Sequence, residues 1–147
     1  MSVNKVILLG NLGRDPDVRY LDNNRVVATF PLATNEVYVD RKGNRIRQTE
    51  WHNIELWDSL ARIAEKYLKK GYTIYLEGKI RTDQWVDKEG VSRSQKKIRG
   101  INITIVNKEK NRFENESNVA EDKELGELPE GLNESYTDEE FHEGELP

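Results

Sequence analysis

Two tryptophans, Trp51 and Trp57, stand six residues apart in a run typical of a β-strand. Side chains alternate between the two faces of a strand, so both indole rings are predicted to share one face with Asn53 and Glu55. The opposite face is predicted to be buried and carries His52, Ile54 and Leu56. Exposed aromatic area usually marks a binding surface. The alternative is that a loop or a partner subunit covers the two rings.

Basic side chains cluster beside further aromatic residues at two predicted hairpin tips, residues 40–44 and 87–90. Aromatic rings stack on the bases of a single strand while lysine and arginine neutralise its phosphates, and each stack contributes about 1–3 kcal/mol. This mixture predicts sequence-tolerant binding of single-stranded nucleic acid, although each basic residue taken alone is more typical of a solvated surface. The predicted contacts are Tyr38, Trp51, Trp57 and Trp85 for the bases, and Lys5, Arg41, Lys42, Arg45, Arg47, Lys88, Arg93 and Lys96 for the phosphates, with Lys97 nearby.

Residues suited to catalysis are scarce. The sequence has no cysteine, no phosphate-binding glycine loop, and only His52 and His142 as histidines. We interpret His52 as a structural or interface residue, and Asp87 and Glu89 as solvated groups of a turn. The sequence therefore predicts a binding protein without metal or cofactor rather than an enzyme. A sugar-binding or RNA-binding module and a structural interaction domain are alternatives, but a sugar-binding module needs no basic body and an interaction domain leaves the paired tryptophans unexplained.

Charge is distributed unevenly along the chain. Residues 1–110 carry 21 of the 23 Lys and Arg and 14 of the 27 Asp and Glu, a net charge of +7, whereas residues 111–147 have a net charge of −11. This asymmetry predicts a polyanion-binding domain over residues 1–107 and a disordered acidic tail over residues 108–147. Charge alone fits a basic surface with a solubilising tail equally well. No apolar run is long enough for a signal peptide or a membrane span, which predicts a soluble, cytoplasmic protein.

The body is predicted to be mainly β. The expected strands cover residues 5–9, as a buried strand, then 25–39, 47–57, 72–86 and a last stretch to about 106, with a turn at 15–17. Pro31 indicates an edge position or a bulge. One helix is predicted after the third strand because apolar residues recur there at helical spacing, with Asp58 or Ser59 as its cap, Lys69 and Lys70 at its C-terminal end, and Gly71 as its stop.

Five strands with a helix between the third and fourth are the plan of the OB-fold, a partly open Greek-key barrel that binds oligonucleotides and oligosaccharides. A five-stranded α+β sandwich is the alternative. Over residues 1–107, many short blocks also resemble the bacterial single-stranded DNA-binding protein family in order and spacing. These blocks include Val3–Leu8, Gly10–Gly13, Val18–Tyr20, Gln48–His52 and Glu77–Gly78.

The resemblance implies an OB-fold, a homotetramer, and a role in DNA replication, recombination and repair at the nucleoid. Trp51 and Trp85 match base-stacking aromatics of the family in kind, while Trp57 stands where the family often has Phe and Tyr38 where it often has Trp. Because an open strand edge is usually paired or covered, the first strand is expected to join subunits. The candidate interface residues are Val3, Val6, Leu8 and His52.

The acidic tail departs from the family pattern, in which an apolar tip closing on Phe docks partner proteins. Here the acidic group with its ring is internal, and the sequence closes on proline. We expect the tail to bind replication and repair proteins through Asp138, Glu139, Glu140, Phe141, Leu146 and Pro147. The alternatives are that a last residue is missing from this sequence, that docking has been lost, or that the tail only screens the basic body at low salt.

Overall fold

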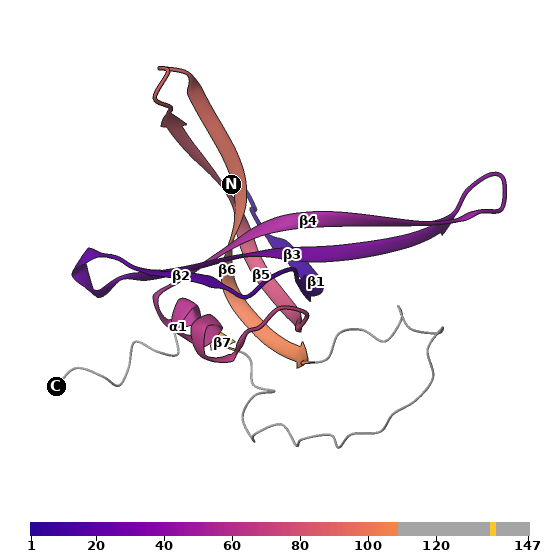
Figure 1. The fold of residues 1–147 in the computed structure, drawn as a ribbon, viewed down its shortest axis with the longest axis horizontal. Helices are drawn as coiled ribbons and strands as arrows, with labels where there is room; N and C mark the ends of the chain where they lie inside the picture. The colour runs from indigo at the N-terminus through magenta and orange to yellow at the C-terminus, as the bar shows by residue number, and fades with distance from the viewer. Residues whose placement is uncertain (109–135, 138–147) are drawn as a thin grey trace.

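The structure, a computed structural model, describes residues 1–108 and 136–137. The chain begins with β1 (Val6–Leu12), β2 (Asp17–Tyr20), a short 3-10 helix η1 (Asp22–Asn24), β3 (Val26–Val39) and β4 (Arg45–Trp57). Helix α1 (Asp58–Tyr67) is followed by β5 (Thr73–Val86) and β6 (Ser92–Asn107), with which the short β7 (Tyr136–Thr137) pairs. Figure 1 shows two long hairpins, β3–β4 and β5–β6, extending in different directions from a small body beside α1.

Five of the strands close into a barrel. Their order is β1-β5-β6-β4-β3, and β1 also pairs with β3 near Leu12 and Leu32. The β4–β6 contact is parallel and short, centred on Ile54 and Ile98, whereas the other barrel contacts are antiparallel. Helix α1 lies between the third and fourth barrel strands in the chain. The predicted mainly β, five-stranded OB-fold with one helix in that position is therefore confirmed.

The core lies inside the barrel and against α1. Its largest fully buried side chains are Phe30, Leu32, Ile54, Leu56, Leu60, Ile74, Leu76, Ile103 and Val26. Helix α1 buries the residues that recur at helical spacing, Leu60, Ala61, Ile63 and Ala64, as expected for an amphipathic helix. No helix in the described part of the chain is long and apolar enough to span a membrane.

Both hairpin tips are built around an aspartate. The carboxylates of Asp40 and Asp87 each accept hydrogen bonds from the backbone N–H groups two and four residues later. Gly43 and Gly90 adopt φ values of 81° and 78°, which glycine reaches without steric cost. The backbone hydrogen bonds, together with the Arg93 side chain, hold the pKa of Asp87 below its usual value. The turns predicted at 40–44 and 87–90 are therefore present, and these hydrogen bonds close them.

The first strand is not buried as predicted. Ile7 and Leu9 are 56% and 58% exposed, while Leu8 packs against the core and Leu12 is buried. Strand β1 lies at the barrel surface with one face inward, so its apolar run covers both a core face and a solvent face. The prediction of a buried strand over residues 5–9 is therefore wrong for its outer face.

Helix α1 also differs from the prediction at both ends. It ends at Tyr67, before Lys69 and Lys70, and Gly71 adopts a φ of 88° in the following turn. No side chain caps its N-terminus. Asp58 is not a cap, because its carboxylate turns away from the helix toward Arg25 and the N–H of residue 26.

Strand β2 was not predicted, and it begins at Asp17, inside the expected turn. It pairs with residues 26–29 of β3, whereas β1 pairs with residues 32 and 33. Pro31 lies between these two segments, and its carbonyl accepts a hydrogen bond from the N–H of Gly13 (2.9 Å). A backbone N–H at residue 31 would point to the same side, into the gap between β1 and β2. Proline, which lacks this N–H, therefore removes no hydrogen bond between paired strands.

Candidate nucleic-acid interface

The tryptophans of β4 lie on its outer face, as the alternation predicts. Trp51 is 58% exposed and Trp57 is half-buried, whereas Ile54 and Leu56 on the opposite face are buried in the core. Trp51 lies over Gly13, because a Cβ built at Gly13 would be 2.4 Å from the ring atom Cζ3. The missing side chain at Gly13 therefore leaves room for the exposed ring.

Pairing between strands extends this outer face onto the second hairpin. Glu55 of β4 lies beside Arg99 of β6 in the parallel contact. Along β6 and β5, the alternate residues on the same side include Arg93 and, opposite it, Trp85, which is 46% exposed. Trp51, Trp57 and Trp85 thus share one continuous surface across β4, β6 and β5, which we call the tryptophan face.

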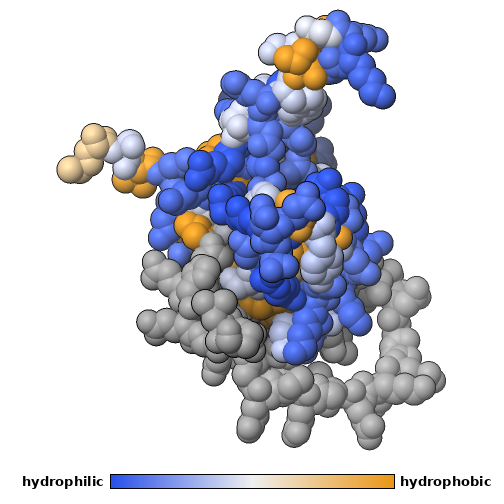
Figure 2. Space-filling model, turned by 90° about the vertical axis from the view of Figure 1, so that its left-hand side faces the viewer, coloured by the Kyte–Doolittle hydropathy of each residue, from blue (hydrophilic) through white to orange (hydrophobic). Residues whose placement is uncertain are grey.

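Cations outnumber carboxylates on the tryptophan face. Alternation and register place on it Arg45, Arg47, Lys79, Arg81, Arg93, Lys97 and Arg99, against Glu55, Glu77 and Asp83. Figure 2 shows the β5–β6 hairpin, at the top of the view, as largely hydrophilic, with apolar side chains near its tip. Lys79, Arg81 and Arg99 were not predicted as contacts, because only the pairing of β6 with β4 and β5 brings them beside the tryptophans.

Trp57 borders a shallow hollow of about 270 Å³ on this face. The Arg25 guanidinium carbon lies 4.7 Å from the centre of the Trp57 ring, and that of Arg99 lies 5.9 Å away, both within the range of cation–π attraction. Four cations, one aromatic ring and two carboxylates line the hollow together with Thr82: Arg25, Arg81, Lys97, Arg99, Trp57, Glu55 and Asp83. This lining suits a ligand with both a flat ring and a negative charge.

A hydrogen bond to Glu55 holds the edge of the Trp57 ring, and ion pairs with Lys97 extend from Glu55 to Asp83. The Trp57 Nε1–H donates to Glu55 Oε1 at 2.5 Å, and Lys97 Nζ donates to Glu55 Oε2 at 2.5 Å. Lys97 also lies 2.5 Å from Asp83 Oδ2. Burial alone would lower the pKa of Lys97, but its hydrogen bonds to Asp83 and Glu55 raise it above the ordinary value. Lys97 therefore stays charged at neutral pH.

A second ion pair holds Arg25 over the ring. Arg25 donates to Asp58 Oδ2 at 3.0 Å, and the same carboxylate accepts the N–H of Val26 at 3.3 Å. Burial would raise the pKa of Asp58, but the hydrogen bonds from Arg25 and Val26 hold it below its usual value. Asp58 has a φ of 50°, a left-handed conformation that is strained for a residue with a side chain. This strain lies at the junction of β4 and α1, directly beside Trp57.

Several predicted contacts lie off the tryptophan face. By alternation, the side chains of Tyr38 and Lys96 point to the other face of their hairpins. Their cross-strand neighbours are Ile46 and Thr82, respectively. By contrast, Lys5, which precedes β1, pairs at 3.6 Å with Glu77, and Glu77 alternates to the same side of β5 as Lys79. The three remaining cations belong to the hairpin turns: Arg41, Lys42 and Lys88.

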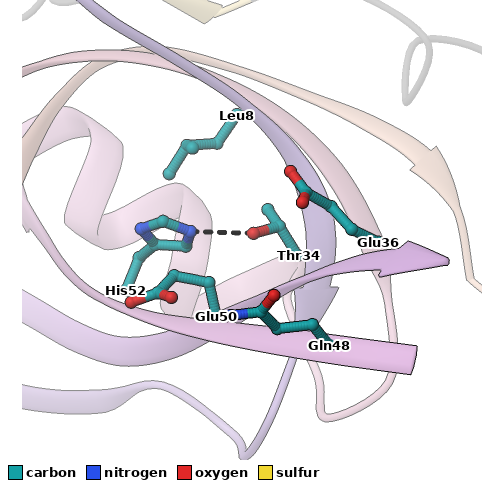
Figure 3. A pocket seen from close by; sticks show the side chains of 6 residues that line it. All are labelled: Leu8, Thr34, Glu36, Gln48, Glu50 and His52. Carbon is teal, nitrogen blue, oxygen red and sulfur yellow. Dashed lines mark hydrogen bonds between the residues drawn. The ribbon is translucent and has the colours of Figure 1, made fainter. Parts of the chain in front are cut away.

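A second hollow, of about 230 Å³, contains His52 (Figure 3). His52 Nε2 lies 2.9 Å from Thr34 Oγ1, across the β3–β4 pairing. Leu8 of β1 faces the imidazole ring, and Glu36, Gln48 and Glu50 complete the lining. Of the predicted interface residues, Leu8 and His52 thus meet here. Val6 is half-buried and Val3 is 91% exposed before β1.

Comparison with protein families agrees with this geometry. The model of the single-strand binding protein family matches residues 3–106, which span the whole barrel and both hairpins. The chain belongs to this family. The description of this family, as single-strand binding proteins, agrees with the sequence-based prediction of a non-catalytic binding protein.

Curated relatives and solved structures of the family are similar to the chain. The single-stranded DNA-binding proteins of Neisseria meningitidis serogroups A and B are each 52% identical over 94 residues, which cover 64% of this chain and 54% of each relative. The chain thus matches about half the length of these relatives.

Two solved structures share the fold. A Plasmodium falciparum SSB in complex with ssDNA superposes with a TM-score of 0.65 at 32% identity, covering 73% of this chain and 97% of that one. A deletion mutant of the Thermus aquaticus single-stranded DNA binding protein gives 0.63 at 27% identity, covering 72% of this chain and 51% of that one.

Proposed function

We propose that this protein binds and protects single-stranded DNA without strong sequence preference. The observation that carries the proposal is the tryptophan face, where Trp51, Trp57 and Trp85 lie among cations on one surface. Stacking tolerates any base because every base has a π-face, and the cations follow the phosphates. The solved complex of a family member with ssDNA supports the choice of ligand. A member of this family is expected to act in DNA replication, recombination and repair, at the nucleoid.

Titration of intrinsic tryptophan fluorescence tests the proposal. Oligo-dT is expected to quench the emission strongly, with weaker quenching by oligo-rU and least by duplex DNA. The logarithm of affinity is expected to fall with the logarithm of salt concentration by roughly 0.7 per phosphate contacted. Equal affinity for duplex and single strand would refute the proposal, and tighter binding of oligo-rU would favour an RNA-binding module instead.

We also propose that the protein assembles as a homotetramer. Strand β1 pairs with β5 along residues 6–11 but meets β3 only at residues 11 and 12, so its other edge has no partner strand along most of its length within the described residues. Ile7 and Leu9 add an exposed apolar face to this edge. An edge of this kind is usually covered by another strand. Val3, Val6, Leu8 and His52 stay the proposed contact residues, and the structure adds Ile7 and Leu9.

Charge on the outer face of β1 is expected to reduce the size of the assembly. Leu9→Lys would place an ammonium group in the apolar contact, where burial without a partner is costly. Light scattering at micromolar protein should then show a smaller mass than for the wild type. Leu21→Lys is the matched control, because Leu21 is 44% exposed and lies on the η1 side of the body. A monomeric wild type would contradict the tetramer itself.

We propose that the acidic tail, residues 108–147, recruits replication and repair proteins. The predicted docking residues Asp138, Glu139, Glu140, Phe141, Leu146 and Pro147 lie outside the described residues. Support for a separate role comes from charge, since the tail has net negative charge while the barrel domain, residues 1–107, is basic. A tail of this charge is suited to partners with basic pockets.

Truncation after Arg112 is expected to leave affinity for oligo-dT unchanged or slightly higher. The truncation removes 13 Asp and Glu side chains but only Lys123 among Lys and Arg, so less negative charge competes with DNA at low salt. In a pull-down with replication and repair proteins, partner binding should disappear. Loss of DNA binding on truncation would show that the body and the tail do not have separate roles.

A further inference from the structure

Lys97 is shared between two carboxylates of unequal exposure in the hollow beside Trp57. The Lys97 side chain is 19% exposed, that of Glu55 is 12% exposed, and that of Asp83 is 54% exposed. Glu55 is held on both oxygens, by Lys97 and by Trp57 Nε1–H. Among the described residues, Lys97 is the one partner given for the Asp83 carboxylate. Because this carboxylate is exposed, it can turn toward solvent. The contact between Lys97 and Glu55 is thus the fixed one, and that between Lys97 and Asp83 is the exchangeable one.

The same hollow is where a nucleotide stacked on Trp57 would place its phosphate. Arg25, Arg81 and Arg99 line it, so it attracts an anion. A phosphate drawn there meets the carboxylate of Asp83, which carries the same sign of charge and already occupies the Lys97 ammonium. Lysine offers three N–H donors but only one positive charge, so the two anions compete for it.

We propose that Asp83 is a built-in competitor of single-stranded DNA, whose carboxylate occupies Lys97 until a backbone phosphate displaces it. This inference rests on the proposed function and adds a residue that limits affinity. Without DNA, Asp83 and Glu55 together keep Lys97 ordered against the edge of Trp57. With DNA, Lys97 keeps Glu55 and exchanges Asp83 for the phosphate, so the ring stays positioned during the exchange.

The first test is the affinity of Asp83→Asn for oligo-dT at low salt. The amide keeps the shape of the side chain and removes its charge, so affinity is expected to rise about two- to fivefold, the range of a partly exposed ion pair. The gain should shrink at physiological ionic strength because of screening. Asp22→Asn removes the same charge from an exposed residue of η1 and should change affinity less.

A double-mutant cycle separates competition for Lys97 from a general field effect. In the Lys97→Gln background, Asp83→Asn should bring no gain, because no ammonium is left to release. In the Lys97→Arg background, which keeps the charge and a donor for Glu55, the gain should persist. Thermal unfolding of each variant confirms that the comparison is made between folded proteins.

Two results would overturn the inference. One is an affinity for Asp83→Asn equal to or below that of the wild type. The other is the same gain in the wild-type and Lys97→Gln backgrounds, which would show a field effect without exchange. If the wild type itself fails to bind oligo-dT, the proposed function falls first and the role of Asp83 falls with it.

Discussion

Replacement of Trp51 by alanine is expected to weaken binding of oligo-dT by about 1–3 kcal/mol, the value of one stacked base. Trp51 is the most exposed of the three rings, and it lies over Gly13 at the surface rather than in the core. Trp85→Ala is expected to have a similar effect, because that ring is 46% exposed on the same face. Fluorescence anisotropy of labelled oligo-dT measures both losses.

Matched variants separate stacking from packing. Trp51→Phe keeps an aromatic face and should retain most of the affinity. Tyr20→Ala removes a ring that is 67% exposed on β2, away from the tryptophan face, and should leave affinity nearly unchanged. If Trp51→Ala and Trp85→Ala each cost less than a few tenths of a kcal/mol, the rings are packing elements and the tryptophan face is not the site.

Leu56→Ala is expected to lower the free energy of unfolding by about 2–5 kcal/mol. The Leu56 side chain is fully buried, and it packs against Gly100, where an added Cβ would lie 2.3 Å from Leu56 Cδ2. Its removal leaves a cavity between β4 and β6, next to the short segment where the two strands pair. Urea denaturation measures the change, at one protein concentration because assembly also affects stability.

Leu21→Ala is the control for the core substitution, because its side chain is 44% exposed and should cost far less. Leu56→Ala and Trp51→Ala test opposite faces of β4, because the two side chains point in opposite directions along the strand. A small cost at Leu56 would contradict the assignment of this face of β4 to the core.

Local sequence patterns predicted much of this fold because they depend on near neighbours. Alternation along one strand is enough to place Trp51 and Trp57 opposite Ile54 and Leu56. The tips at 40–44 and 87–90 are likewise local, since an aspartate and a glycine within five residues close each turn. The helix was predicted from its apolar spacing, although its ends were not.

Features that depend on pairing between distant strands were not predictable from one sequence. The hollow at Trp57 requires β4 to meet β6 with Glu55 beside Arg99, more than 40 residues apart. Arg25 reaches Trp57 only because Asp58 holds it from the start of α1. Burial of β1 was also mispredicted, because an apolar run does not reveal that Ile7 and Leu9 face outward from the barrel.

The predicted site residues divide in the same way. Proximity in sequence grouped Tyr38 with the tryptophans, but strand alternation places it on the other side of the β3–β4 hairpin. The Tyr38 ring is 48% exposed on that other side. It can contact DNA only if the single-stranded DNA passes around the β3–β4 hairpin. Tyr38 therefore distinguishes a path confined to the tryptophan face from one that wraps the hairpin.

Photo-crosslinking of oligo-dT that contains 5-iododeoxyuridine, followed by mapping of the modified peptides, tests the path of the DNA most directly. A base stacked on an aromatic ring couples to that ring on irradiation, so each adduct reports a contact. We predict adducts at Trp51, Trp57 and Trp85, and their loss when unlabelled oligo-dT competes. Adducts confined to Tyr20 or Tyr67, with none on the three tryptophans, would contradict the assignment of the tryptophan face as the DNA-binding surface.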